Sequence, residues 1–482
     1  MFLVSGLYDY LLLLLSLLLV VFEGAATVFT VLIPKPVINA ISRMLKAIIP
    51  PSYDEIELEK DAFMSQRVTD ISEAISFVDI CAIHGYRATE HVVPTRDGYI
   101  LGIHHLLPRP ENRNGEVVYL HHGLLMNSEI WISTPTAADS IAFQLVEAGY
   151  DVWLGNNRGN KYSKKHISYH PASREFWNFC LDEFALYDIP GTVDYILRHT
   201  GKPSITYIGF SQGSAQAFAA LSIHPELNRK INLFIALGPA MSPPSVGPRI
   251  LQTLMTASPS LLFALFGHRV ILRSTVFWQS IMLPKLYIKM IDLSNKMLFE
   301  WISQDISWAQ KLTGYTHLYS YTSVKCVVHW FQIIARNNGI YMFDDDTFGG
   351  LGSWLSVSAS KFYQVPPYPT QNITTPIEII YGTNDTLVDI NSLLSKLPPP
   401  QGVTAIDGYE HLEMIWGRKV PTVILPCILE ILANRRTKSL PGPDLNMQAV
   451  LPVKAAYASI NAHSMGEIVL PKSRTSSATL GI

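Results

Sequence analysis

Residues 205–214 have the sequence Ile205-Thr206-Tyr207-Ile208-Gly209-Phe210-Ser211-Gln212-Gly213-Ser214. The first six are mostly apolar and predict a buried strand, while the Ala-rich residues after Ser214 predict a helix. The glycines at 209 and 213 leave room for a sharp turn between the two, with Ser211 at its tip. An ordinary Gly-Ser turn is the alternative. The flanking strand and helix favour Ser211 as a nucleophile, because the start of a helix offers N–H groups to an oxyanion.

Strand-like runs with helix-like segments between them surround this turn along the chain. The runs lie at 117–120, 151–155, 233–237 and 377–382. This alternation predicts a mostly parallel central sheet with helices on both faces. Residues 91–103 contain a turn between two short β-type runs and predict an antiparallel hairpin before that sheet.

Two polar residues that follow late strands complete a triad with Ser211. Asp385 comes just after the 377–382 strand, and His411 follows the strand-like run 403–406. The chain order serine, acid, histidine is the order found in α/β-hydrolases. We expect His411 to accept the Ser211 proton and to pass it to the leaving group, while Asp385 orients the imidazole and offsets its charge.

Asp389 and Asp407 are the alternatives for the acid. Asp385 is preferred because it lies nearest the carboxyl end of a strand, where the catalytic residues of such a sheet converge. The oxyanion needs two donors, and we expect the backbone N–H groups of Leu124 and Gln212 to provide the oxyanion hole.

The pair His121-His122 comes just before Leu124 and is expected to shape the turn through local hydrogen bonds. The chain contains neither an H-E-x-x-H motif nor a Cys/His cluster with metal-ligand spacing. The sequence therefore predicts no metal and no cofactor.

The composition excludes some classes of partner. Lys and Arg number 37 against 39 Asp and Glu, so nothing indicates binding to nucleic acid. Charged residues are only 16% and apolar residues 48%, which indicates contact with lipid. The four cysteines are widely scattered and are predicted to be buried thiols, which favours a reducing compartment slightly.

An apolar segment at 11–33, interrupted by Glu23-Gly24, predicts a membrane anchor. It is long enough to cross a bilayer as one helix, which takes about 20 residues. A hairpin bent at Glu23-Gly24 is a second alternative, because a spanning helix would place that carboxylate in hydrocarbon. A cleaved signal peptide is the third, and the lack of Lys or Arg before the apolar run disfavours it.

The segment after this anchor carries basic residues and an apolar face. Lys35, Arg43 and Lys46 predict that the following domain is cytosolic. Residues 37–49 have helical spacing of apolar positions and predict an interfacial helix, with packing on the protein core as the alternative.

A cap is predicted between two parts of the sheet, where residues 241–362 are rich in Leu, Phe, Trp, Met and Tyr and contain apolar helix-like runs at 261–266 and 277–290. Such an insertion suits an acyl-chain pocket, and an extra helical layer is the alternative.

The predicted domains are a membrane anchor with its interfacial helix (1–50), a linker (51–80), the first part of the core (81–241), the helical cap (242–365), the second part of the core (366–434) and a disordered tail (435–482).

Several motifs together resemble the acid lipase family of α/β-hydrolases, which includes gastric and lysosomal lipases and fungal steryl ester hydrolases. The motifs before the serine turn are Gly85-Tyr86, residues 90–101, H-G-L-L at 122–125, residues 151–159, Glu175-Phe176-Trp177, Asp182-Glu183-Phe184 and Tyr187-Asp188-Ile189-Pro190. The others are the G-F-S-Q-G turn itself, residues 382–385 and His411-Leu412. The resemblance implies hydrolysis of neutral-lipid esters by Ser211, Asp385 and His411, with Leu124 and Gln212 as oxyanion donors. Secreted members begin with a cleavable signal, and the anchor in this chain resembles the fungal steryl ester hydrolases more closely.

The resemblance and the anchor together predict a steryl ester hydrolase at the endoplasmic reticulum or on a lipid droplet, with the plasma membrane as a further alternative. Its expected partners are a neutral lipid substrate, either a steryl ester or a triacylglycerol, and the lipid surface itself. A triacylglycerol lipase with the same triad is the nearest rival. An inactive hydrolase-fold scaffold that binds lipid is the rival from another class, and the filled triad positions disfavour it.

Overall fold

The computed structural model describes residues 44, 60–108, 110–244, 247, 259–272, 275, 279, 282–345 and 365–437. None of the helices within these ranges combines the length and the apolar character that crossing a bilayer requires. The predicted anchor at 11–33, nearly all of the predicted interfacial helix and nearly all of the tail lie outside the described residues. These three predictions stay predictions.

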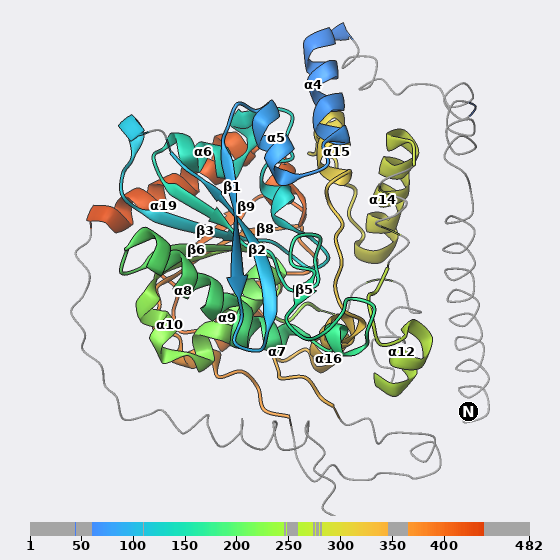
Figure 1. Ribbon diagram of the computed structural model, residues 1–482, viewed down its shortest axis with the longest axis vertical. Helices are drawn as coiled ribbons and strands as arrows, with labels where there is room; N and C mark the ends of the chain where they lie inside the picture. Colours follow the sequence, from blue (N-terminus) through green and yellow to red (C-terminus); the bar gives the residue numbers. More distant parts are fainter. Residues whose placement is uncertain are drawn as a thin grey trace, which may run out of the picture. The chain divides into compact units, whose positions relative to one another are not determined.

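A single mixed sheet, parallel over most of its width, forms the centre of the fold (Figure 1). Its order is β1-β2-β4-β3-β6-β7-β8-β9, with β5 paired to β2. Every pair from β4 to β9 along this order is parallel, whereas β1, β2 and β5 pair antiparallel. The strands are β1 (Ala88–Pro94), β2 (Tyr99–Leu106), β3 (Val117–His121), β4 (Asp151–Leu154), β5 (Lys165–His166), β6 (Ile205–Phe210), β7 (Ile231–Leu237), β8 (Ile377–Gly382) and β9 (Gly402–Ile406).

Helices cover both faces of this sheet. Figure 1 shows α8, α9 and α10 on one side, and α6 and α19 on the other. The core helices are α4 (Ala62–Glu73), α5 (Phe77–Ile83), α6 (Ile141–Glu147), α7 (Leu181–Glu183), α8 (Ile189–Thr200), α9 (Gln212–Ile223), α10 (Pro225–Lys230), α17 (Ile390–Lys396), α18 (Glu413–Trp416) and α19 (Leu425–Thr437). Those of the segment predicted as a cap are α12 (Pro259–Phe266), α14 (Pro284–Phe299), α15 (Trp308–Tyr315) and α16 (Val324–Arg336).

The two central strands β3 and β6 are buried along their whole length. A strand with helices on both faces needs apolar residues on both faces, which explains why these segments are nearly continuous apolar runs. The predicted parallel sheet with helices on both faces is therefore confirmed. The hairpin predicted over 91–103 is confirmed as well, since β1 and β2 pair antiparallel with His91 opposite Ile103.

Two helices lie where the sequence predicts a linker over 51–80. Asp61 begins α4 by accepting a hydrogen bond from the Met64 N–H, and Ser76 begins α5 in the same way. The apolar residues Ile71, Phe77 and Ile80 are fully buried in the main core. Their burial stabilises this part as an element of the hydrolase core. The linker prediction rests on the acidic residues of 54–61, which come before both helices.

Prolines lie in the first turn of two helices. The sequence predicts a helix over 184–198, and helical turns cover this range: residues Phe184–Asp188 are π-helical and α8 continues from Ile189 to Thr200. Pro190 has no N–H, so it suits the first turn of a helix and interrupts the ladder before it. In the cap, α14 begins at Pro284 and is followed by the left-handed residue Glu300, while position 277, where the predicted helix starts, lies outside the described residues.

Candidate active site

Ser211 occupies the predicted turn between β6 and α9. Its backbone is in the left-handed region, with φ of 56°, a conformation that costs a non-glycine residue about 1–3 kcal/mol. A Cβ on Gly209 would lie 2.7 Å from the Gly213 carbonyl, and a Cβ on Gly213 would lie 2.4 Å from the His121 carbonyl oxygen. Close backbone contacts therefore require glycine at both positions beside the strained serine.

The predicted acid and base form a direct hydrogen bond. His411 Nδ1 lies 2.6 Å from Asp385 Oδ2, and both side chains are buried. The other carboxylate oxygen of Asp385 accepts a bond from the Leu387 N–H, which fixes the carboxylate. Within the described chain, His411 Nε2 is buried and has no hydrogen-bond partner. Because Nδ1 donates to the carboxylate, Nε2 carries the free lone pair that a general base requires.

The same edge of the sheet brings this pair beside Ser211. Phe210, the residue before Ser211, has its ring 4.8 Å from the His411 ring. Gly238 follows β7, and a Cβ there would lie 3.5 Å from His411 Nδ1 and 3.6 Å from Asp385 Oδ2. The structure thus places the three residues of the predicted triad at the carboxyl ends of β6, β8 and β9.

The turn after β3 approaches Ser211 from the opposite side. A Cβ on Gly123 would lie 3.4 Å from Ser211 Oγ, so Leu124, the next residue, is close to the nucleophile. Leu125 has a positive φ of 59°, and its carbonyl accepts a hydrogen bond from the Ser320 N–H of the cap. Gln212 is the first residue of α9, where a backbone N–H has no partner within the helix. The two residues predicted to donate backbone N–H groups to the oxyanion, Leu124 and Gln212, therefore both lie next to Ser211.

His121 and His122 hold this turn by local hydrogen bonds, as the sequence predicts. His121 contacts Tyr119 and Asn157, whereas His122 bonds the Gly123 carbonyl and accepts from the Asn157 N–H. Burial lowers the pKa of His122 to about 4 and that of His121 well below its ordinary value. Both rings are neutral near pH 7 and stabilise the turn without carrying charge.

The two alternative acids lie elsewhere. Asp389 accepts a hydrogen bond from the Ser392 N–H and caps α17. Asp407 is exposed, on the turn that follows β9. Only Asp385 contacts His411 among these three carboxylates in the described part of the chain.

A cap residue that sequence reasoning missed holds the side chain of Gln212. The indole Nε1 of Trp330, in α16, donates to Gln212 Oε1 at 2.6 Å, and Cys326 Sγ lies 3.6 Å from the same oxygen. Gln212 and Trp330 are both buried. The cap is thereby bonded to a residue whose backbone N–H is a predicted oxyanion donor.

We expect Trp330→Phe to lower kcat roughly tenfold with a smaller change in KM. The substitution leaves Gln212 Oε1 without its strong donor, and an unpaired buried acceptor costs about 1–3 kcal/mol. Gln212 relieves that cost by moving, which displaces its N–H from the oxyanion. Steady-state kinetics of the purified variant measure the effect.

The matched control is Trp308→Phe. Trp308 also lies in the cap, in α15, and its buried indole nitrogen has no hydrogen-bond partner in the described part of the chain. Equal losses of kcat in the two variants would show that only packing of the cap matters, and would contradict a positioning role for Trp330.

A second cap contact fixes the base. The ring of Trp301 stacks on the His411 ring at 5.4 Å and 19°, and its Nε1 donates to Thr386 Oγ1. Two carboxylates beside His411 hold the backbone that follows Trp301. Glu410 accepts from the N–H groups of Ile302 and Ser303, and Glu413 accepts from that of Asp305. We call residues 301–305 the base-side strap.

The fold defines the class as α/β-hydrolases, and the strained serine and the Asp385–His411 pair lie where the sequence predicts the triad of such a fold. Residues 116–417 match the family described as alpha/beta hydrolase fold, and residues 77–135 match the family described as partial alpha/beta-hydrolase lipase region.

Named relatives make the assignment more specific. A probable lipase of Schizosaccharomyces pombe is 46% identical over 378 residues, which cover 77% of this chain and 84% of the relative. Gastric triacylglycerol lipase of Rattus norvegicus is 33% identical and covers 73% and 89%, and lipase member K of Homo sapiens is 34% identical and covers 74% and 88%. The chain belongs to this lipase family of α/β-hydrolases, and it is a carboxylic ester hydrolase.

Proposed function

We propose that the protein is a membrane-anchored steryl ester hydrolase that acts through an acyl-enzyme on Ser211. The observation that carries this proposal is the buried 2.6 Å hydrogen bond between His411 and Asp385 beside a strained serine. It supplies the base, the orienting acid and the nucleophile that ester hydrolysis needs.

The reaction follows from these positions. Ser211 Oγ attacks the ester carbonyl carbon while His411 Nε2 takes the hydroxyl proton. The N–H groups of Leu124 and Gln212 stabilise the oxyanion, and collapse breaks the bond to the alcohol, which leaves with the proton from His411. Water then attacks the acyl group on Ser211 by the same steps, which releases the fatty acid and restores the serine.

An apolar substrate is supported by what packs against the oxyanion turn. Leu125 contacts a buried apolar cluster in the cap formed by Leu262, Ile271, Val324 and Val328. Cap walls of this kind suit acyl chains and a sterol nucleus. Triacylglycerol is the second candidate, because the chain is similar to gastric triacylglycerol lipases and the ester bond is cut in the same way.

The alcohol preference is tested with the full-length protein in washed membranes, using cholesteryl oleate and trioleoylglycerol as separate substrates. We expect kcat/KM for the steryl ester to exceed that for the triacylglycerol by about tenfold or more, in the range that pocket fit provides. The reverse ratio would make the protein a triacylglycerol lipase. Hydrolysis of neither ester would favour a lipid-binding scaffold.

The same membranes test the location, which we propose to be the endoplasmic reticulum or lipid droplets with the catalytic domain in the cytosol. Basic residues after the apolar segment at 11–33 support this orientation. Activity is expected in the membrane or droplet fraction, and protease added to intact vesicles should destroy it. Activity that survives this treatment would contradict a cytosolic domain.

A further inference from the structure

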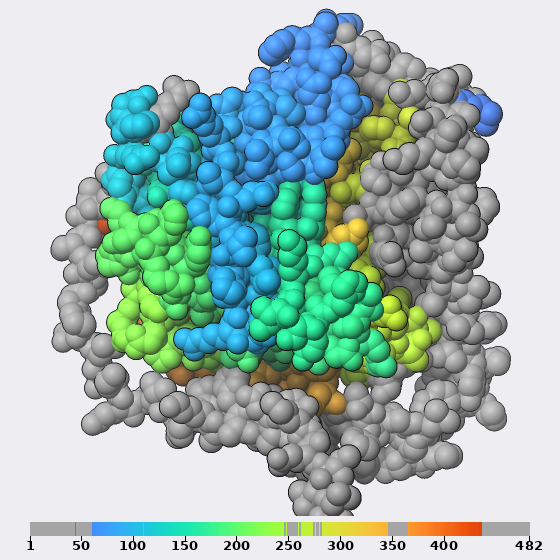
Figure 2. All heavy atoms as spheres, viewed as in Figure 1, coloured from blue at the N-terminus to red at the C-terminus, as the bar shows by residue number. Residues whose placement is uncertain are grey.

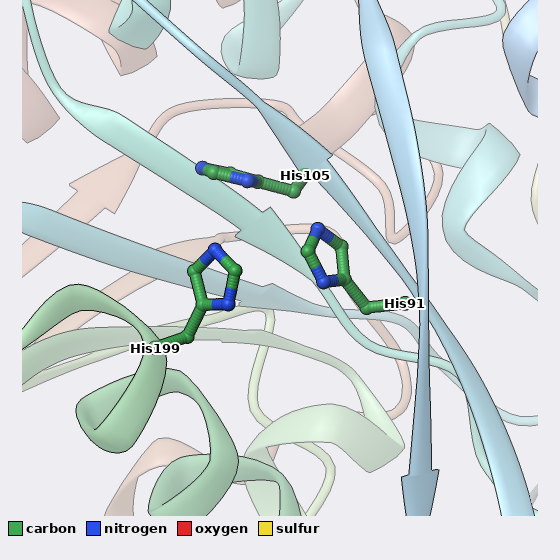
Figure 3. A group of neighbouring side chains, drawn as sticks. All are labelled: His91, His105 and His199. Atoms are coloured by element: carbon green, nitrogen blue, oxygen red, sulfur yellow. The ribbon is translucent and has the colours of Figure 1, made fainter.

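Three histidines from separate elements meet on the face of the sheet that α8 covers. Figure 3 shows His91 on β1, His105 on β2 and His199 on α8 with their rings turned toward one another. One ring nitrogen from each histidine lies within 4.8 Å of the others. We call these residues the histidine cluster, and it is separate from the triad because β4 and β3 lie between β2 and β6.

The sheet register explains why two of these rings are neighbours. Thr89 is opposite His105, and His91 is opposite Ile103, so His91 and His105 are diagonal neighbours on one face of an antiparallel pair. Their ring centroids are 5.5 Å apart. The last turn of α8 then brings the His199 ring to 4.8 Å from His91 and 6.0 Å from His105.

Hydrogen bonds orient two of the rings, and a bound ion would use the unengaged nitrogen of His105 and replace one of the two hydroxyl bonds of His91. Asp151 Oδ1 accepts from His105 Nε2 at 2.5 Å, which leaves the Nδ1 lone pair of that ring. The Tyr195 hydroxyl bonds His91 Nδ1, and the exposed Thr89 hydroxyl bonds the other nitrogen. A carboxylate behind a histidine is the arrangement that raises ligand basicity in zinc sites.

The three rings differ in burial: His105 is buried and His91 is half-buried. His199 is exposed, and Figure 2 shows the β1–β2 hairpin, in blue, at the surface beside the green helices α8 and α10.

We propose that the histidine cluster is a binding site for one Zn²⁺ ion, with His91, His105 and His199 as ligands, Asp151 as the orienting carboxylate and water as the fourth ligand. Zinc bonds to imidazole nitrogen are about 2.0–2.1 Å long, so the ligand nitrogens of a tetrahedral site lie roughly 3.3 Å apart. His199 closes the remaining gap, because it is exposed near the end of its helix.

The bound ion joins the β1–β2 hairpin to α8 and stabilises the folded chain by mass action. The site has no part in ester hydrolysis, since it lies three strands from Ser211. The other role open to these rings is packing, because all three surround Trp153, with the His105 ring stacked on it at 3.9 Å. Packing alone requires no metal, so metal binding decides between the two roles.

The test is a calorimetric titration of the chelator-treated full-length protein with Zn²⁺ near neutral pH. One ion is expected per chain, together with a higher unfolding temperature in the presence of Zn²⁺. We expect Asp151→Asn to weaken binding by about 10–100-fold, as loss of an orienting carboxylate does, and His199→Ala to weaken it at least as much.

The control is His170→Ala, which removes another exposed histidine and should leave the affinity unchanged. His199 is exposed and forms no buried hydrogen bond in the described structure, so its replacement leaves folding intact. Absence of binding, or equal zinc affinity in His199→Ala and the unmodified chain, would overturn the proposal. Ester hydrolysis is not the readout, so the result is independent of the proposed function.

Discussion

Ser211→Ala is expected to lower kcat for any ester substrate by about 10⁴–10⁶-fold, the range found when the nucleophile of a serine triad is removed. The substitution deletes one oxygen atom and changes little else. The turn stays in place because Gly209 and Gly213 make the close contacts that shape it. The residual rate comes from binding and from the oxyanion donors, which the substitution leaves intact. Release of labelled fatty acid by the purified variant measures the loss.

Ser222→Ala is the control for this prediction. Ser222 lies on α9, the helix that Ser211 precedes, and the two residues are equally exposed at 6%. Within the part of the chain that the structure describes, its hydroxyl donates only to the Ala219 carbonyl of the same helix. This variant should retain full activity, and turnover of Ser211→Ala at a comparable rate would refute the nucleophile.

Asp385→Asn is expected to lower kcat about 10⁴-fold with the fold unchanged. Asparagine fills the same volume but carries no charge to stabilise the imidazolium that forms on His411. Its amide can also hold the imidazole in the tautomer with a proton on Nε2, where the base needs a lone pair. Kinetics over a range of pH, together with a thermal unfolding curve, separate this loss from misfolding.

Asp389→Asn is the matched control, since it makes the same change four residues later. Asparagine caps a helix about as well as aspartate does, so the bond from the Ser392 N–H to this side chain persists. Activity should stay within a few-fold of the unmodified protein. A large loss in Asp389→Asn with little loss in Asp385→Asn would move the acid to position 389.

The sequence was most informative where function depends on neighbours along the chain. Gly209, Ser211 and Gly213 lie on one turn, so their spacing together with the apolar run before them and the Ala-rich run after them predicts the strand, the turn and the helix. Asp385 was predictable because it follows a strand end, and strand ends of a parallel sheet meet at one edge. The same reasoning placed His411 after β9.

Contacts between distant segments could not be predicted from spacing. Trp330 bonds Gln212, and Trp301 stacks on His411, yet each pair is joined only when the cap folds onto the core. The spacing of apolar residues along the chain treats these tryptophans as apolar positions. It does not predict which residue accepts a hydrogen bond from the indole N–H. The histidine cluster was missed for the same reason, because the register of β1 and β2 and the end of α8 together create it.

The base-side strap has a consequence for engineering this enzyme with caps from its relatives. A chimaera that takes the whole segment between β7 and β8 from another lipase also replaces the backbone N–H groups bound by Glu410 and Glu413. Graft junctions placed after residue 305 keep the Trp301 ring stacked on the His411 ring. The grafted cap then changes the substrate pocket, while His411 keeps this packing contact. Junctions before residue 301 require positions 410 and 413 to be exchanged together with the cap.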